Sequence, residues 1–205
     1  MYLEEMINKN PMENVEMIKK ANFLSTQGKE LLPECETVTV LSPDEIQKFK
    51  AEAFSTFSNG KQKYQQAAAY ILMLNTGARP GEILAVNNRD IDIEKRQMKI
   101  QNSVKEVYNR EGTKATGGKS AKVGKTKTLT SNRTVPLNDA AIEAIKELRA
   151  EYYFGEDSPL ICDEHGNFTK PVNFRKRFYR ILKAARIETK GLHSLRHTFA
   201  TNLVT

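Results

Sequence analysis

The sequence predicts an α+β protein that is mainly helical and has one small three-stranded antiparallel sheet. Apolar residues recur with helical spacing in several segments after residue 41. They follow the alternation of a strand in residues 90–93 and 98–107, which a turn joins as a hairpin, and a third strand is predicted over residues 127–137. Hydrophobic residues make up 39% of the chain and charged residues 28%, as in an ordinary globular domain.

The N-terminal part of the chain is predicted to be the end of a helix followed by a linker. Residues 1–9 have a helical pattern that stops at Asn10, because a residue before proline is disfavoured in the helical region. No apolar period is sustained afterwards, so residues 16–40 are interpreted as a linker. The sequence SPDE at residues 42–45 then combines an N-cap serine, a proline at the first helical position and a glutamate at the third. A new domain is therefore predicted over residues 41–205.

Several further helices follow from apolar spacing and capping residues. A helix over residues 61–75 is predicted to bury Tyr70, Ile71, Leu72 and Leu74. Other helices are predicted to begin near Glu82, Asn138, Thr169 and His193. The helix after Asn138 has an apolar face of Ile142, Ile145, Leu148 and Tyr152, and the helix after Thr169 has one of Phe174, Phe178, Ile181 and Leu182. Helices therefore account for most of the predicted core.

Basic residues are concentrated in the middle of the chain. The net charge is +7, and the segment from Lys105 to Arg133 contains eight basic residues and only two acidic ones. Residues 109–125 are rich in glycine, lysine, serine and threonine, which predicts a long mobile loop. Several more basic residues cover the helix after Thr169, where they form either a solvated face or a surface for a polyanion. This distribution favours nucleic acid as a partner.

Other classes of protein are excluded by what the sequence lacks. The longest apolar run, residues 67–74, is too short to cross a bilayer, and the acidic N-terminus does not resemble a signal peptide. Cys35 and Cys162 are too few for a disulfide framework or a cysteine-based zinc site. We therefore expect a cytoplasmic protein without a membrane partner.

Arg79 is a candidate anion ligand because it lies in a turn before a helix start. The following Pro80 favours an extended conformation at Arg79, and a helix start favours anions. A guanidinium at this place is able to bind a phosphate with two hydrogen bonds. The alternative is an ordinary surface ion pair with Glu82, three residues on.

The C-terminal sequence HSLRHTFATNLVT offers a second candidate. His193 and Arg196 are three residues apart at a predicted helix start, so both side chains can reach one target. Histidine transfers protons near neutral pH, and arginine adds a fixed charge. His197 follows one turn after His193, but HSLRH lacks the glutamate of HExxH and no third ligand is evident. No metal site is therefore expected.

Three motifs, TGARPGEIL, KTLTSNRTVPL and HSLRHTFAT, occur in this order and together resemble the tyrosine recombinase family of phage and conjugative-transposon integrases. The resemblance covers about residues 41–205 and implies the catalytic domain of that family. The opening INKNPMENV resembles the end of the family's core-binding domain, so residues 1–15 are interpreted as its remnant.

The resemblance implies a reaction on DNA without metal or cofactor. In this family a tyrosine attacks a phosphodiester, which gives a 3′-phosphotyrosyl link and a free 5′-hydroxyl, and the reverse step rejoins a strand. By motif, Arg79 and Arg196 would bind the non-bridging oxygens, and Glu82 would orient the arginines. His193 would assist proton transfer. Lys127 would protonate the leaving 5′-oxygen, with Lys125 as its competitor.

The resemblance also implies double-stranded DNA as the partner and a tetramer of protomers for the full-length recombinase. Basic side chains outside the reaction centre are expected to contact the DNA: Lys119, Lys122, Lys125, Arg133 and Arg175.

The family's nucleophilic tyrosine is expected roughly thirty residues beyond Arg196, and the sequence ends at Thr205. We therefore expect a C-terminally incomplete catalytic domain that binds the scissile phosphate but does not cleave DNA covalently, and that is a monomer in isolation. Apolar surface is then expected around Leu195, Phe199 and Leu203. The alternatives are a non-catalytic DNA-binding truncation product and a relative of type IB topoisomerases.

Overall fold

The computed structural model describes residues 39–111, 114–125 and 132–204, with the backbone alone within residues 108–121 and at residues 125 and 204. The described residues all belong to one compact unit. The predicted remnant at residues 1–15, most of the linker, and Lys127 lie outside the described residues, so the predicted domain limits remain predictions.

Capping residues set the starts of two helices. Helix α2 (Pro43–Ala53) begins with the capping box that the sequence predicts, because Ser42 Oγ accepts from the Glu45 amide and Glu45 Oε2 accepts from the Ser42 amide. Asn138 Oδ1 accepts from the Ala141 amide at the start of α5 (Asp139–Glu151). Both predictions are confirmed.

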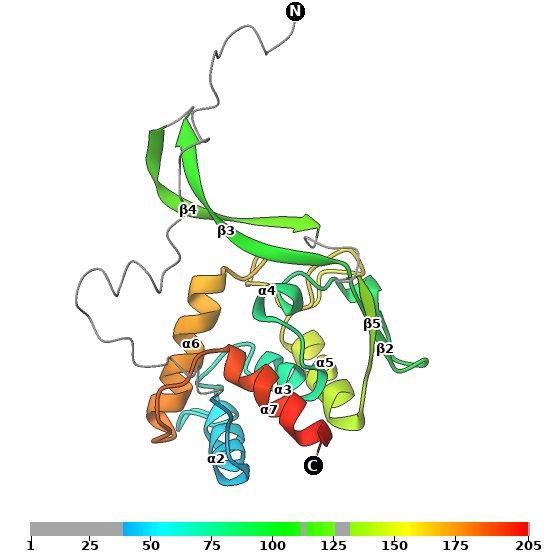
Figure 1. The fold of residues 1–205 in the computed structure, drawn as a ribbon, viewed down its shortest axis with the longest axis vertical. Helices are drawn as coiled ribbons and strands as arrows, with labels where there is room; N and C mark the ends of the chain where they lie inside the picture. The colour runs from blue at the N-terminus through cyan, green and yellow to red at the C-terminus, as the bar shows by residue number, and fades with distance from the viewer. Residues whose placement is uncertain (1–38, 112–113, 126–131, 205) are drawn as a thin grey trace, which may run out of the picture. The chain divides into compact units, whose positions relative to one another are not determined.

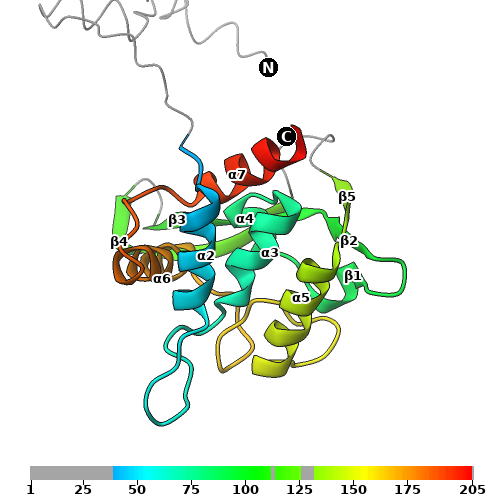
Figure 2. The ribbon, with the colours of Figure 1, turned by 90° about the horizontal axis from the view of Figure 1, so that it is seen from below.

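Two more long helices complete the helical part, α6 (Pro171–Ala184) and α7 (His193–Val204). The predicted apolar residues of α6, Phe174, Phe178, Ile181 and Leu182, are all buried. Helix α2 packs against α6, while α5 and α7 pack against a central helix, α3 (Ala68–Thr76) (Figures 1 and 2).

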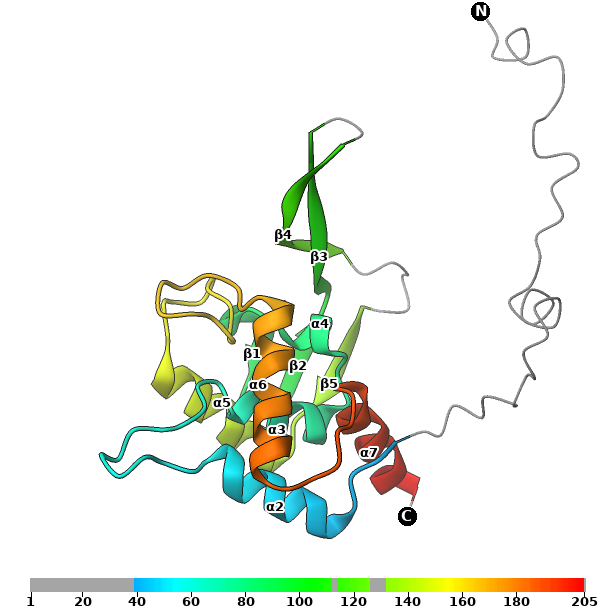
Figure 3. The same ribbon diagram turned by 90° about the vertical axis from the view of Figure 1, so that its left-hand side faces the viewer.

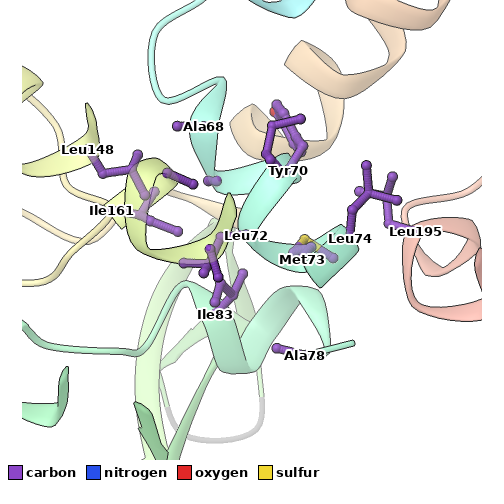
Figure 4. Packing of buried hydrophobic residues seen from close by; sticks show 14 of the residues in the cluster. Ala68, Tyr70, Leu72, Met73, Leu74, Ala78, Ile83, Leu148, Ile161 and Leu195 are labelled. Carbon is purple, nitrogen blue, oxygen red and sulfur yellow. The ribbon is translucent and has the colours of Figure 1, made fainter. Parts of the chain in front are cut away.

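Helix α3 (Ala68–Thr76) is the centre of the core, and nearly all of its residues are buried. Leu74 lies beside Leu195 of α7, and Leu72 lies beside Ile83 of the next helix (Figure 4). The predicted start at residue 61 is wrong. Gln66 has a φ of 57°, and its buried side chain hydrogen-bonds to Thr169, far away in sequence. The left-handed conformation interrupts the helix, and a tertiary contact of this kind is not visible in local spacing.

A one-turn helix and a small sheet follow α3. Helix α4 spans only Pro80–Ile83. A short 3₁₀ helix, η2 (Asn88–Asp90), leads into β1 (Ile91–Asp92), β2 (Gln97–Ile100) and, later in the chain, β5 (Arg133–Pro136). These strands pair antiparallel in the order β1-β2-β5, with Met98 between Ile91 and Val135. The predicted three-stranded antiparallel sheet is confirmed.

Within residues 109–125, the segment predicted as a mobile loop, the described residues 109–111 and 114–125 belong instead to a two-stranded antiparallel ribbon. It consists of β3 (Asn102–Glu111) and β4 (Lys114–Lys125). Figures 1 and 3 show that it extends away from the helices. Among its described side chains only Val104 is buried, whereas Val107 and Val123 are exposed. Most of the described side chains of the ribbon therefore lie outside the core, and the two strands pair through an antiparallel backbone ladder.

The expected apolar surface on α7 is only partly present. Leu195 is fully buried against α3, and Phe199 is half-buried, whereas Leu203 is 70% exposed. The expectation is wrong for Leu195 because α3 already covers that side of α7. No described helix has both the length and the apolar character needed to span a bilayer.

Candidate active site

Glu82 is the centre of a group of arginines that come from three parts of the fold. Its carboxylate is only 3% exposed, on the single turn of α4. Oε1 accepts a hydrogen bond from Arg79 Nη1 at 2.8 Å, and Oε2 accepts one from the Arg79 amide at 2.9 Å. Arg133, the first residue of β5, donates from Nη2 to Oε2 at 2.8 Å and from Nη1 to Oε1 at 3.2 Å. One buried carboxylate therefore binds two guanidinium groups.

These contacts keep Glu82 ionised. Burial on its own would raise the pKa of this carboxyl, but the hydrogen bonds from Arg133 and Arg79 outweigh it and bring the pKa to about 2. The alternative of an Arg79–Glu82 pair is thus realised in the structure, but Glu82 is buried and shared with Arg133. The pair is not an isolated surface contact.

Arg196 adds a third guanidinium from α7. Its Nη1 donates to the carbonyl oxygen of Gly77 at 2.5 Å, in the turn between α3 and α4. Burial lowers the pKa of Arg196, and the charges of Arg79 and Arg133 lower it further. This mutual repulsion means that the three arginines lie close together. Three positive charges and one negative charge leave an excess of two positive charges here.

This arrangement is suited to binding an oxyanion. Arg79 is 52% exposed and Arg133 is 29% exposed. Arg79 uses one side-chain nitrogen on Glu82, so its remaining donors face outward. Fixed guanidinium groups bind phosphate-like anions strongly and stabilise charge that develops in a transition state. The helix start expected to assist Arg79 contributes little, because α4 is a single turn.

His193 lies next to this group of charges. It is exposed at the first position of α7, one turn before Arg196. A cavity of about 340 Å³ is lined by His193, by Pro80 and Gly81 of α4, and by Arg175 and Tyr179 of α6. His193 therefore lies near the start of α4, which directly follows Arg79 in the chain. It is accessible from solvent, as a proton-transfer group has to be.

The residues predicted to contact DNA are distributed over two places. Arg175 is exposed on α6 and lines the cavity beside His193. Lys122 is exposed on β4, opposite Lys105 of β3. Lys119 and Lys125 belong to β4, but their side chains, like all of Lys127, lie outside the described residues. The choice between Lys127 and Lys125 as the acid thus stays open.

Arg133 makes a contact inside the protein that the sequence does not predict, since both of its terminal nitrogens bind Glu82. Its contact with DNA stays a prediction. The carbonyl of Gly77, which binds Arg196, was not identified from the sequence at all. Neither contact has a local sequence signal, since each joins residues more than fifty positions apart.

A metal ion finds no cluster of ligands among the described side chains. No group of three or more histidine, cysteine, aspartate or glutamate residues lies within reach of one ion there. His197 is partly buried on α7.

Similarity to known proteins points to one family. The model of the phage integrase family matches residues 39–205. A tyrosine recombinase XerC-like protein of Caldanaerobacter subterraneus subsp. tengcongensis is 29% identical over 173 residues, which cover 78% of this chain and 44% of the relative. This chain therefore spans less than half the length of that relative.

Solved structures show the same fold at low sequence identity. The Tn1549 transposon integrase in complex with circular intermediate DNA matches with a TM-score of 0.65 and 20% identity, over 90% of this chain and 63% of that one. The XerA recombinase matches with a TM-score of 0.56 and 20% identity, over 81% and 50%. The chain belongs to the phage integrase family, and its residues 39–205 have the fold of a tyrosine recombinase catalytic domain.

Proposed function

We propose that this chain supplies the phosphate-binding part of a tyrosine-type recombinase that cuts and rejoins DNA strands when mobile DNA is integrated. Membership of the family places it among proteins of site-specific recombination. The observation that carries the proposal is the cluster of Arg79, Arg133 and Arg196 around the buried carboxylate of Glu82. It offers a site with excess positive charge to a phosphodiester.

In the proposed reaction each charged group has one task. A tyrosine hydroxyl attacks the phosphorus and gives up its proton, a transfer that His193 assists, while Arg79 and Arg196 bind the non-bridging oxygens as negative charge builds up. The bond from phosphorus to the 5′-oxygen breaks, and this oxygen leaves with a proton from Lys127 or, alternatively, from Lys125. Rejoining is the reverse, in which a 5′-hydroxyl attacks the phosphotyrosine. The balance of bonds requires neither a cofactor nor a metal.

We propose further that the nucleophile is none of the tyrosines in this chain. Tyr64 donates to Glu52, and burial together with that carboxylate raises its pKa to about 12. Tyr70 is fully buried and donates to the carbonyl of Phe174, and burial raises its pKa as well. Phenols held in this way are poor nucleophiles. Tyr179 is exposed in the cavity beside His193, so it is the residue against which this part of the proposal has to be tested.

Duplex DNA as the substrate is supported by charge and by the relatives. Helix α6 has no acidic residue and exposes a row of basic ones: Arg175, Lys176, Arg180 and Lys183. The Tn1549 integrase and lambda integrase were both solved bound to DNA. For the whole recombinase we propose a tetramer on two duplexes.

Binding of inorganic phosphate and of a DNA duplex tests the site. Arg79→Ala and Arg196→Ala should each weaken phosphate binding by on the order of tenfold or more, since each removes a charge-assisted hydrogen bond. Arg89→Ala is the control, because Arg89 forms an exposed pair with Asp157 elsewhere. Unchanged phosphate affinity in both variants would contradict the proposed site.

Covalent trapping on a nicked DNA substrate tests the nucleophile. The chain and its Tyr179→Phe variant should both give no covalent protein–DNA adduct. An adduct that forms with the chain and disappears in Tyr179→Phe would assign the nucleophile to Tyr179. DNA binding without cleavage, even when a longer natural chain is assayed, would instead favour the alternative of a non-catalytic DNA-binding product.

A further inference from the structure

Arg133 differs from the other two arginines in how it contacts Glu82. Its two terminal nitrogens bind the two carboxylate oxygens in a paired arrangement, at 2.8 and 3.2 Å. Arg79 binds the same carboxylate through one side-chain nitrogen, and Arg196 binds a backbone carbonyl. The side chain of Arg133 is also less exposed than that of Arg79, at 29% against 52%. Its donors are thus largely used inside the protein.

We propose that Arg133 is a positioning residue, which holds and neutralises Glu82 so that Arg79 and Arg196 remain available to a phosphate. The inference rests on the proposed function, because it assigns a role within the same site. It replaces the expectation that Arg133 contacts DNA directly.

The need for such a residue follows from the place of Glu82. A buried carboxylate next to a phosphate site repels the phosphate unless cations compensate it. With Arg133 present, three arginines and one glutamate give an excess of two positive charges. Without Arg133 the excess falls to one, and Glu82 has only Arg79 and Arg196 to bind. The two arginines would then be drawn toward the carboxylate and away from the ligand.

The fold gives Arg133 this position through the sheet. Arg133 pairs in register with Ile100 at the end of β2, and Ile100 is buried in the core. The backbone of Arg133 is therefore fixed from the side of the sheet, while its side chain reaches α4. A planar guanidinium on a fixed backbone matches a carboxylate in two places at once, which lysine is unable to do.

A set of four variants tests the inference on the whole chain: Arg133→Gln, Arg133→Lys, Glu82→Gln and the double variant Glu82→Gln/Arg133→Gln. Affinity for inorganic phosphate is measured by calorimetry. Arg133→Gln should weaken phosphate binding by about tenfold, because it removes one positive charge from the site and leaves the Glu82 carboxylate without its paired guanidinium. The double variant has the wild-type excess of charge and should recover affinity to within about threefold of wild type. Arg133→Lys should stay several-fold weaker than wild type, since lysine lacks the paired donors.

The opposite pattern would overturn the inference. If Arg133 binds the phosphate itself, the double variant stays as weak as Arg133→Gln. If only its charge matters, Arg133→Lys equals wild type. Urea unfolding of each variant shows whether a loss of phosphate affinity comes from misfolding. The double variant is the least affected by misfolding, because it leaves no buried charge without a partner.

A second measurement does not depend on phosphate binding. The carboxyl of Glu82 can be titrated by carbon NMR, and Arg133→Gln should raise its pKa well above the wild-type value of about 2. An unchanged pKa would contradict the positioning role. If Arg79→Ala and Arg196→Ala leave phosphate binding intact, the proposed function fails, and this titration still decides whether Arg133 controls Glu82.

Discussion

Gly77 serves two contacts of the candidate site at once. It ends α3 with a φ of 60°, in the left-handed region that favours glycine, and its carbonyl oxygen accepts the hydrogen bond from Arg196. A Cβ at this position would meet the ring of Phe199 at less than van der Waals distance. The position of Arg196 thus depends on a residue without a side chain.

Gly77→Ala is expected to destabilise the protein by about 2–4 kcal/mol, from left-handed strain of about 1 kcal/mol and displacement of the Phe199 ring. It should also weaken phosphate binding, because α7 moves together with Arg196. Urea unfolding and phosphate titration check both effects. Gly60→Ala is the matched control: Gly60 has a φ of 78° but open space around it, so only the strain should be seen. Equal losses in the two variants would show that the Phe199 contact is unimportant.

The low pKa of Glu82 predicts how stability depends on pH. A carboxyl whose pKa falls from 4.5 to about 2 on folding contributes about 3 kcal/mol above pH 4.5. This contribution is lost as the pH falls through the folded-state value. The difference in unfolding free energy between wild type and Glu82→Gln should therefore be largest at pH 7 and shrink between pH 4.5 and 2. A difference that stays constant over this range would contradict the ion pairs described for Glu82.

At the scale of elements, α7 is tied to the first residues of the described domain. The buried hydroxyl of Thr198 accepts from the Leu41 amide at 2.8 Å and donates to the carbonyl of Ser194 at 2.8 Å. Just before α7, Lys190 donates to both carboxylate oxygens of Glu45 on α2, a contact that lowers the pKa of Glu45. The helix that carries His193 and Arg196 is thus held from α3 on one side and from residues 41–45 on another.

Thr198→Val should cost about 1–3 kcal/mol, because it leaves the buried Leu41 amide without an acceptor. Thr201→Val is the control, since Thr201 makes the same type of bond to a carbonyl four residues earlier but is exposed. Thermal unfolding compares the two. Similar melting temperatures for both variants would mean that the contact with Leu41 does not stabilise α7.

The elements that were predictable are those set by neighbouring residues. The starts of α2 and α5 follow from Ser42 and Asn138, whose side chains bond to amides three residues on. The start of α3 was missed because Gln66 is held by a residue a hundred positions away. The beginning of β3 was predicted from the alternation of residues 98–107, but residues 109–125 were taken for a loop because they contain almost no apolar residue. In the site, motifs located Arg79 and Arg196, but the partner of Arg133 depends on how β5 pairs with β2.

At the scale of the whole molecule, the excess of positive charge has a specific place. The net charge is +7, and Arg175, one of the exposed basic residues of α6, lines the same cavity as His193. DNA affinity should accordingly fall steeply with salt, because each neutralised phosphate releases counterions.

Arg175→Gln should weaken DNA binding and reduce the slope of log affinity against log salt by about one. Lys146→Gln provides the control, since Lys146 pairs with Glu143 on α5 and should leave the slope unchanged. Affinities measured by fluorescence anisotropy at four salt concentrations give the slopes. Equal slopes for the Arg175 variant and wild type would remove Arg175 from the DNA-binding surface.

The β3–β4 ribbon lies in the chain between two strands that are themselves neighbours in the sheet. Ile100 of β2 pairs with Arg133 of β5, so the sheet is already closed at the point where the ribbon departs. The ribbon is in effect a long insertion into a hairpin. The part of the ribbon beyond its base can therefore change in length and charge without rebuilding the core, whereas the base cannot, because Val104 is buried in the core there.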